Sequence, residues 1–84
     1  MNHYVVICLY RTGGTSNECD IIGIEDTYEE AKKLFDEELS DVISDAKEWD
    51  MEFDEEEISE NYFEAYGNEW NPSYYIKLYI QEVK

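Results

Sequence analysis

The sequence predicts an α+β fold in which a four-stranded antiparallel sheet, in the chain order β-β-α-β-β, carries one long helix on one face. Apolar residues recur at helical spacing between Thr27 and Trp49. Two segments before this stretch and two after it are rich in β-branched and aromatic residues, as strands are. With 84 residues the chain has the length of a single domain, which we expect to span residues 1–84.

The first two strands are expected to form a hairpin. Asn2 to Tyr10 is the first strand, Arg11 to Asn17 is a turn segment rich in Gly, Thr, Ser and Asn, and Glu18 to Ile24 is the return strand. Alternation assigns the apolar residues of the return strand to two faces: Ile22 and Ile24 to one, and Cys19 and Ile21 to the other. Gly23 indicates either a bulge or a close approach of the helix.

The two cysteines lie in the two strands of this hairpin. A two-residue Gly13-Gly14 loop would place Cys8 opposite Cys19, and a four-residue loop from Gly13 to Ser16 would pair Cys19 with Tyr10. Both loops keep the thiols on the same face. We interpret both cysteines as small buried hydrophobic residues rather than as a disulfide or metal ligands, because a metal site needs further Cys or His ligands.

The central helix is expected to begin at Thr27. Thr27 to Glu30 fits a capping box, in which the threonine hydroxyl accepts a hydrogen bond from the amide of Glu30. The apolar residues of the helix fall within about 80° of arc on a helical wheel, so this stripe should face the core. Its members are Ala31, Phe35, Leu39, Val42, Ala46 and Trp49, flanked by Leu34 and Ile43.

A second cluster on the same wheel consists of carboxylates within about 40° of one another. We name it the acidic ridge: Glu30, Glu37, Asp41 and Glu48, with Asp45 and Glu38 extending it toward the apolar border. Like charges four residues apart destabilise an isolated helix by a few tenths of a kcal/mol each. The lysines of the helix, Lys32, Lys33 and Lys47, fall on other parts of the polar arc.

The segment from Asp50 to Glu60 carries seven acids. Asp54 followed by Glu57 repeats the capping pattern, which predicts a short helix or turn from Asp54 to Glu60. A calcium loop is the alternative for such a run. However, an EF-hand needs a Gly at its sixth position, and this segment contains no Gly. We therefore expect no specific metal site and no cofactor.

Asn61 to Tyr66 and Ser73 to Val83 are the last two strands. Pairing Glu64 with Lys77 sets tyrosine against tyrosine across the strands, which predicts an outer face that exposes four of them: Tyr62, Tyr66, Tyr75 and Tyr79. The first and last strands of the chain are the most hydrophobic and should be central. Whether these two strands pair parallel or antiparallel stays open at this point.

The charge balance is extreme. The chain has 22 acidic and 6 basic residues, a net charge of -16. Such self-repulsion destabilises a compact state and excludes nucleic acid and anionic membranes as direct ligands. It favours either a basic partner or an adaptation to salt, and adaptation to salt predicts acids over every surface. No signal peptide or membrane span is recognisable, so we expect a cytoplasmic protein.

No catalytic signature is present, and we expect a non-enzymatic protein. His3 is the only histidine and has no Ser or Cys partner placed by the sequence. The Thr12-Gly13-Gly14-Thr15 stretch joins two strands and lacks the lysine of a phosphate loop. Pairs of carboxylates are too numerous here to indicate acid/base chemistry.

In general character, this short acidic chain resembles the anti-CRISPR and anti-restriction DNA mimics of phages and mobile elements. The acidic ridge, the Asp54-Glu55-Glu56-Glu57 run and Glu69-Trp70-Asn71 carry the resemblance, which spans residues 25–70. It implies a bacterial cytoplasm and a basic nucleic-acid-binding partner, such as a CRISPR effector or a restriction enzyme. The residues expected to bind that partner are Glu30, Glu37, Asp41, Asp45, Glu48, Asp54, Glu55, Glu56, Glu57, Glu69 and Trp70.

Two other functions stay open on the sequence alone. The first is a protein-interaction module or homodimer that uses the tyrosine face, because tyrosine offers rigid apolar area with a polar tip. The second is a protein that sequesters a small ligand, which needs a preformed apolar pocket.

Overall fold

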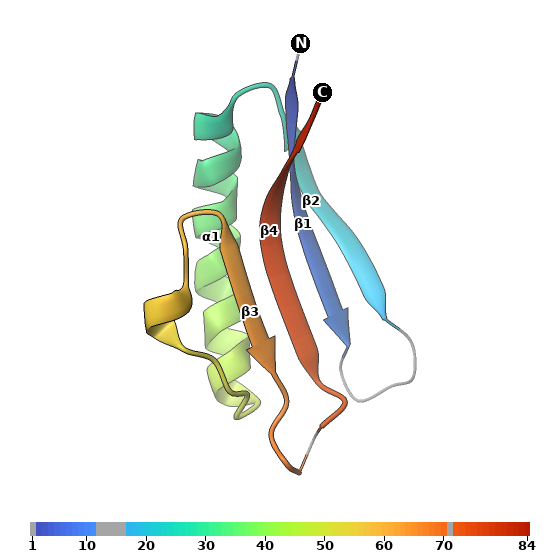
Figure 1. Cartoon of the computed structure of the whole chain (residues 1–84), viewed down its shortest axis with the longest axis vertical. Helices are drawn as coiled ribbons and strands as arrows, with labels where there is room; N and C mark the ends of the chain where they lie inside the picture. The colour runs from blue at the N-terminus through green and yellow to red at the C-terminus, as the bar shows by residue number, and fades with distance from the viewer. Residues whose placement is uncertain (1, 12–16, 71) are drawn as a thin grey trace.

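The structure, a computed structural model, describes residues 2–11, 17–70 and 72–84. Its elements follow one another along the chain as β1 (His3–Arg11), β2 (Glu18–Glu25), α1 (Tyr28–Glu48), the 3₁₀ turn η1 (Glu55–Glu57), β3 (Tyr62–Tyr66) and β4 (Tyr75–Val83). The predicted α+β class, with a four-stranded antiparallel sheet and one long helix, is confirmed. Figure 1 shows α1 running along one face of the sheet.

The strand order in the sheet is β2-β1-β4-β3. The first and last strands are therefore central, as their hydrophobicity predicts, and they pair antiparallel. His3 lies opposite Val83, so the two chain ends meet at the same end of the sheet (Figure 1). The predicted pairing of β3 with β4 is also confirmed, with Glu64 opposite Lys77 and two tyrosine pairs beside it.

The core lies between α1 and the sheet. Its largest fully buried side chains are Phe35 from the helix and Val6, Phe63 and Leu78 from three strands. Ala31, Phe35, Val42 and Ala46 of the predicted apolar stripe are buried, whereas Leu39 is half-buried and Trp49 is 40% exposed. Among the described residues the buried set contains no charged side chain, so the acids lie at the surface.

The helix begins and ends as local rules require. The amide of Glu30 donates to the Thr27 hydroxyl at 3.2 Å, which confirms the first half of the capping box. At the other end, the amide of Met51 donates to the carbonyl of Ala46 at 2.9 Å and that of Asp50 to the carbonyl of Lys47 at 3.2 Å. These two bonds form a Schellman motif, in which Asp50 takes the left-handed position with φ 56°.

On the turn side, the hairpin differs from both predicted registers, whereas Tyr4, Val5 and Val6 pair with Glu25, Ile24 and Gly23 as the four-residue loop predicts. Cys8 lies opposite Asp20, and Cys19 lies opposite Leu9. The two thiols therefore face opposite sides of the sheet, Cys8 buried and Cys19 exposed, so the expectation of two buried thiols on one face was wrong. The Gly13-Gly14 and Gly13 to Ser16 loops considered for the turn lie outside the described residues.

A β-bulge in β2 separates the two observed registers. The register shifts between Val6 and Ile7, where Ile22 and Gly23 together occupy one step of the ladder. A methyl group on Gly23 would lie 2.3 Å from Cδ2 of Leu34, so the helix approaches the strand closely there. Beyond the bulge, Ile24 lies opposite Val5 and faces away from the helix, whereas Ile22 packs against the core. The prediction that Ile22 and Ile24 share one face was therefore wrong.

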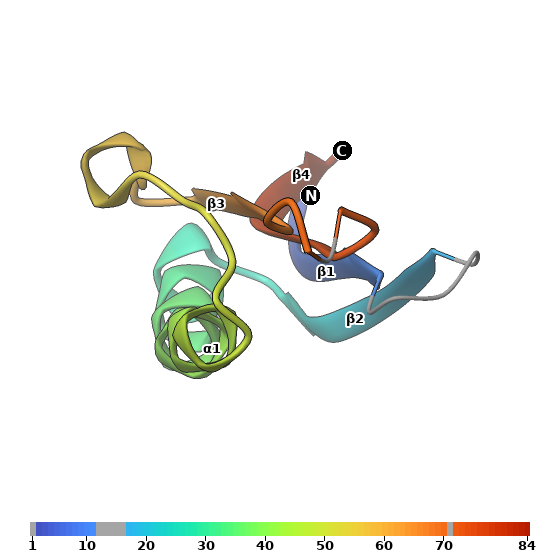
Figure 2. The ribbon, with the colours of Figure 1, turned by 90° about the horizontal axis from the view of Figure 1, so that it is seen from below.

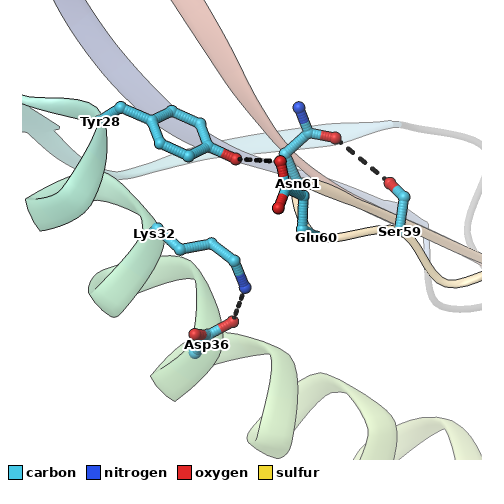
Figure 3. Close-up of polar contacts among 6 residues, drawn as sticks. All are labelled: Tyr28, Lys32, Asp36, Ser59, Glu60 and Asn61. Carbon is cyan, nitrogen blue, oxygen red and sulfur yellow. Dashed lines mark hydrogen bonds and ion pairs between the residues drawn. The ribbon is translucent and has the colours of Figure 1, made fainter.

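The chain returns from α1 to the sheet along the β3 edge. Asp54 caps η1 by accepting a hydrogen bond from the amide of Glu56 at 2.9 Å, which confirms the predicted short turn. The Tyr28 hydroxyl donates to Glu60 at 3.3 Å and ties the helix start to the end of this segment (Figure 3). Seen along the sheet, α1 covers one face, η1 lies beyond β3, and none of the described elements covers the opposite face (Figure 2).

Replacing Asp50 with glycine should stabilise the protein by about 1 kcal/mol, because glycine adopts positive φ without steric cost and the change removes a negative charge from the helix C-terminus. Thermal unfolding measures the effect. Asp50→Asn is the control that removes the charge and keeps a side chain at positive φ, so it should give only part of the gain. A lower melting temperature for Asp50→Gly would contradict the assignment of this cap.

Candidate functional site

The acidic ridge lies along the edge of α1 that faces β2, and its four members are exposed. Two hollows on this edge show how the strand joins the ridge. Near the helix start, Glu30 and Glu37 line a hollow together with Glu25 of β2. Nearer the helix end, Glu38 and Asp45 line a second hollow together with Asp20 of β2. The ridge is therefore one side of a larger acidic surface to which β2 contributes.

The second hollow has a volume of about 230 Å³, and we name it the acidic groove. Its carboxylates are Glu38 and Asp45 on the helix side and Asp20 on the strand side. Between them lie two aromatic rings and an apolar lining: Tyr10, Trp49, Cys8, Ile22, Val42 and Ile76. The Trp49 ring is held against Tyr74, with the ring centroids 4.9 Å apart.

The carboxylates of the groove raise the pKa values of their neighbours. Burial, followed by the charges of Asp41, Asp45 and Asp20, raises the pKa of Glu38. A hydrogen bond to Glu18 is the largest of the causes that raise the pKa of Tyr10 to about 12. Neighbouring carboxylates contribute to both shifts, and a bound cation would reduce that contribution.

Cys8 is not a reactive thiol. Burial, and then the charge of Glu38, raises its pKa to about 11. A protonated thiol is neither a nucleophile nor a metal ligand, so Cys8 acts as part of the apolar lining. Carboxylates around aromatic and aliphatic side chains match a lysine or arginine side chain, whose charge meets the acids while its methylenes cover the apolar lining.

The cations of the helix are mostly engaged on its other edge. Lys32 pairs with Asp36, as Figure 3 shows. Lys47 pairs with Glu55 of η1 at 3.3 Å. Lys33 is the exception to the expectation that the lysines lie apart from the ridge, because it lines the same hollow as Glu30 and Glu37. The ridge is therefore only partly screened from within the chain.

The structure does not bring the other predicted acids to the ridge. Asp54 and Glu57 line a separate hollow of about 340 Å³ between η1 and β3, together with Glu52 and Glu64. Glu55 and Glu56 are exposed on η1, and Glu69 and Trp70 are exposed in the connection between β3 and β4. The predicted partner-binding residues thus divide into three surfaces, of which the helix surface holds Glu30, Glu37, Asp41, Asp45 and Glu48.

The four tyrosines lie on the sheet face away from α1, as the register predicts. Tyr66 is 54% exposed, whereas Tyr62, Tyr75 and Tyr79 are half-buried, so the expectation that all four are exposed was wrong for three of them. The hydroxyls of Tyr66 and Tyr75 donate to the carboxylate of Glu64, and these bonds lower its pKa. The ammonium of Lys77 stands 5.0 Å from the centroid of the Tyr79 ring and 5.4 Å from that of Tyr62.

Within residues 2–11, 17–70 and 72–84, no group of three or more His, Cys, Asp or Glu side chains is arranged to hold a metal ion. No helix of these residues is long and apolar enough to cross a membrane. His3 lies at the start of β1, where its Nδ1 is 3.3 Å from Oδ1 of Asp26, and it does not line the groove.

Sequence reasoning missed the contribution of β2 to this site. Glu18 and Asp20 alternate with Cys19, so their common face was readable from the sequence. Which face that is depends on the hairpin register, and the observed register places Asp20 beside buried Cys8. Trp49 was expected in the core, whereas it forms a wall of the groove.

No protein-family model, no curated protein and no solved structure matches this chain.

Glu38→Gln should raise the melting temperature at pH 7 and reduce its dependence on pH. The raised pKa of Glu38 means that the folded state binds its proton more tightly than the unfolded state. Protonation of Glu38 contributes its whole stabilising free energy when the pH is below the pKa of the unfolded state. This contribution is lost as the pH rises through the higher pKa of the folded state. The wild type should therefore become more stable as pH falls from about 7 toward 4.5, and the variant should gain less.

Measurements for this comparison stay above about pH 4.5, because the lowered pKa of Glu64 acts in the opposite sense below it. Glu29→Gln, on the exposed first turn of α1, removes the same charge away from the groove. It should leave the pH dependence as in the wild type. Equal pH dependence for Glu38→Gln and the wild type would contradict the electrostatic description of the groove.

Proposed function

We propose that the protein is an acidic inhibitor that occupies the basic nucleic-acid-binding groove of another protein and so acts as a DNA mimic. The observation that carries the proposal is the segregation of carboxylates. The acids of β2, namely Glu18, Asp20 and Glu25, face the helix side of the sheet and extend the ridge. An adaptation to salt alone would distribute acids over both faces of the sheet.

The spacing of carboxylates along α1 can be compared with the spacing of phosphates along DNA. The six carboxylates of the acidic ridge and its extension, from Glu30 to Glu48, are spaced about 5 Å apart on average along the helix axis at about 1.5 Å rise per residue. One strand of duplex DNA carries a charge every 3.4 Å or so, and the two strands together one every 1.7 Å or so. The ridge is therefore less densely charged than one DNA strand, and the β2 acids supply further charge across the groove.

The acidic groove provides an anchor that charge alone does not. A lysine or arginine of the partner can place its methylenes against Trp49 and its charge between Glu38 and Asp20. Such a desolvated contact contributes more to affinity than an ion pair at the rim, where solvent and salt screen the charges. With about 230 Å³, the groove lies below the range of about 300–1,000 Å³ typical of small-molecule sites. The hollow of about 340 Å³ between η1 and β3 is lined by four carboxylates, which argues against sequestration of an apolar ligand there.

The proposal extends to the biological setting that the resemblance implies. A partner of this kind is a CRISPR effector, a restriction enzyme or another DNA-binding defence protein in a bacterial cytoplasm. The basic channel of such a protein is built to contact phosphates through Lys and Arg side chains, and these accept carboxylates with similar geometry. The tyrosine face has a different chemistry, and the charged partner is not expected to bind there.

Reversal of Glu37, Asp41 and Glu48 to lysine should weaken partner binding by at least about 100-fold, because close charge pairs at interfaces couple by about 1.5–7 kcal/mol. The immobilised protein is exposed to a bacterial lysate at low salt, and the proteins that elute at high salt are identified. Displacement of a fluorescent DNA duplex from the captured protein then tests competition.

A control variant carries the same change in charge elsewhere. Glu52, Glu60 and Glu82 are exposed and lie off α1, so their reversal to lysine should leave binding within a few-fold of the wild type. Capture of no nucleic-acid-binding protein, or equal capture by the ridge variant and the wild type, would refute the proposed function.

A further inference from the structure

The face of the sheet away from α1 is apolar. Because Val6 and Cys8 point into the core, the residues that alternate with them on β1 lie on the opposite face: Val5, Ile7 and Leu9. Their partners on β2 are Ile24, Ile21 and Cys19. Ile21 and Ile24 are 62% and 61% exposed, which is unusual for side chains of this size. We name these residues, together with Tyr75, Tyr79 and Val83 of β4, the outer face.

A sheet that faces water on one side normally alternates apolar and polar residues. β1 does not follow this rule, because its residues are apolar on both faces over Val5 to Leu9. Strands with this pattern are typical of sheets that are covered on both sides. In the part of the chain that the structure describes, only one side is covered, as Figure 2 shows.

The outer face is also nearly free of acids, although the chain has a net charge of -16. The acids of β2 and Glu82 of β4 lie on the helix side, since Glu82 is opposite Tyr4 in the same register as Glu25. On the same side of the sheet as the outer face, the described strand residues include one acid, Glu64, and the basic residues His3, Arg11 and Lys77. Several polar groups on this side already have partners, because Tyr66 and Tyr75 donate to Glu64 and Arg11 donates to the carbonyl of Ser73. Covering this face therefore buries little unsatisfied polarity.

We propose that the outer face is the interface of a homodimer, in which two copies pack sheet against sheet about a two-fold axis. Among the described strand residues this face carries no net negative charge, so two such acidic chains can meet there without strong repulsion. Sheets packed face to face lie about 10 Å apart, and helices of about 10 Å diameter then lie on the two outsides. The two acidic ridges are thus separated by several Debye lengths of about 10 Å at 0.1 M salt, so their mutual repulsion is weak.

The size of the face fits a reversible dimer. The four strands have 9, 8, 5 and 9 residues, so at about 3.3 Å per residue and about 4.8 Å between strands the sheet covers roughly 490 Å². Two copies would then bury roughly 1,000 Å² in total before side-chain relief is counted. Stable specific interfaces bury about 1,200–2,000 Å², so this dimer is expected to lie at the weak end, with a Kd in the micromolar range. The inference is independent of the proposed function of the ridge.

Isoleucine methyl NMR on dilution of the wild-type protein tests this interface directly. The δ1 methyl signals of Ile7, Ile21 and Ile24 on the outer face should shift together as the protein is diluted from about 1 mM to about 1 μM, through the range of weak interfaces. Those of the core-facing residues Ile22, Ile76 and Ile80 should stay in place and serve as an internal control. Shifts confined to the core-facing set, or no shift in any methyl, would overturn the proposal.

Sedimentation equilibrium adds a variant test. Ile21→Lys combined with Ile24→Lys should weaken association by at least about 100-fold, because two charges would be buried against apolar groups. Glu37→Lys changes the net charge by the same amount on the opposite side of the molecule and should leave the dimer intact. A double variant that dimerises as the wild type does would overturn the proposal, and circular dichroism establishes that the variant is folded.

Salt distinguishes this surface from the ridge. Raising NaCl from about 50 to 500 mM should strengthen the dimer several-fold, because screening reduces repulsion between the two chains, whereas it should weaken binding of a basic partner. A chain that is monomeric at about 1 mM protein in high salt has no such interface. Loss of partner capture with retention of the dimer would refute only the proposed function, and the reverse result would refute only the dimer.

Discussion

Repulsion among the 22 acidic side chains is the constraint on which the rest of this structure depends. The core that opposes it is small, with Phe35, Phe63, Leu78 and Val6 as its largest fully buried members. Among the described residues only three acids form an ion pair with a base, so most of the negative charge is unneutralised within the chain. Such a fold is tolerable when the charges are kept apart from the apolar surfaces and are free to meet solvent or a cation. The separation of acids from the outer sheet face follows from this requirement.

Features set by local periodicity could be predicted from the sequence. The helix depends on a 3.6-residue repeat and on a cap at Thr27, both of which act within a few residues. The pairing of β3 with β4 could be predicted because Glu64 opposite Lys77 also aligns two tyrosine pairs, and no other register satisfies so many cross-strand contacts. The central position of β1 and β4 followed from their hydrophobicity, since central strands have both edges hydrogen-bonded and are the most buried.

The features that depend on contacts distant in sequence could not be predicted. The bulge at Ile22 and Gly23 lies where Leu34 of the helix approaches the strand closely. The alternation of apolar and polar residues in the hairpin does not indicate this contact. One extra residue at that point sends Ile24 to the outer face. The groove was not foreseen either, because Asp20 faces the helix only in the register observed on the turn side of the bulge. The acidic run at Asp54 was misplaced because the path of the segment after α1, along the β3 edge, is decided by packing rather than by composition.

The two surfaces of this molecule are consequences of a single distribution of charge. Placing the acids of β2 toward the helix builds the far wall of the groove, and the same alternation places Ile21 and Cys19 on the outer face. If the whole of β2 were shifted by one residue against β1, its acids would lie on the outer face and its apolar residues would face the groove. Both surfaces would then be lost together. Because Gly23 has no side chain, Leu34 of the helix can lie close to β2 at the bulge. The bulge keeps the acids on the helix side along all of β2, because without the extra residue Glu25 would face outward and Ile24 would face the helix.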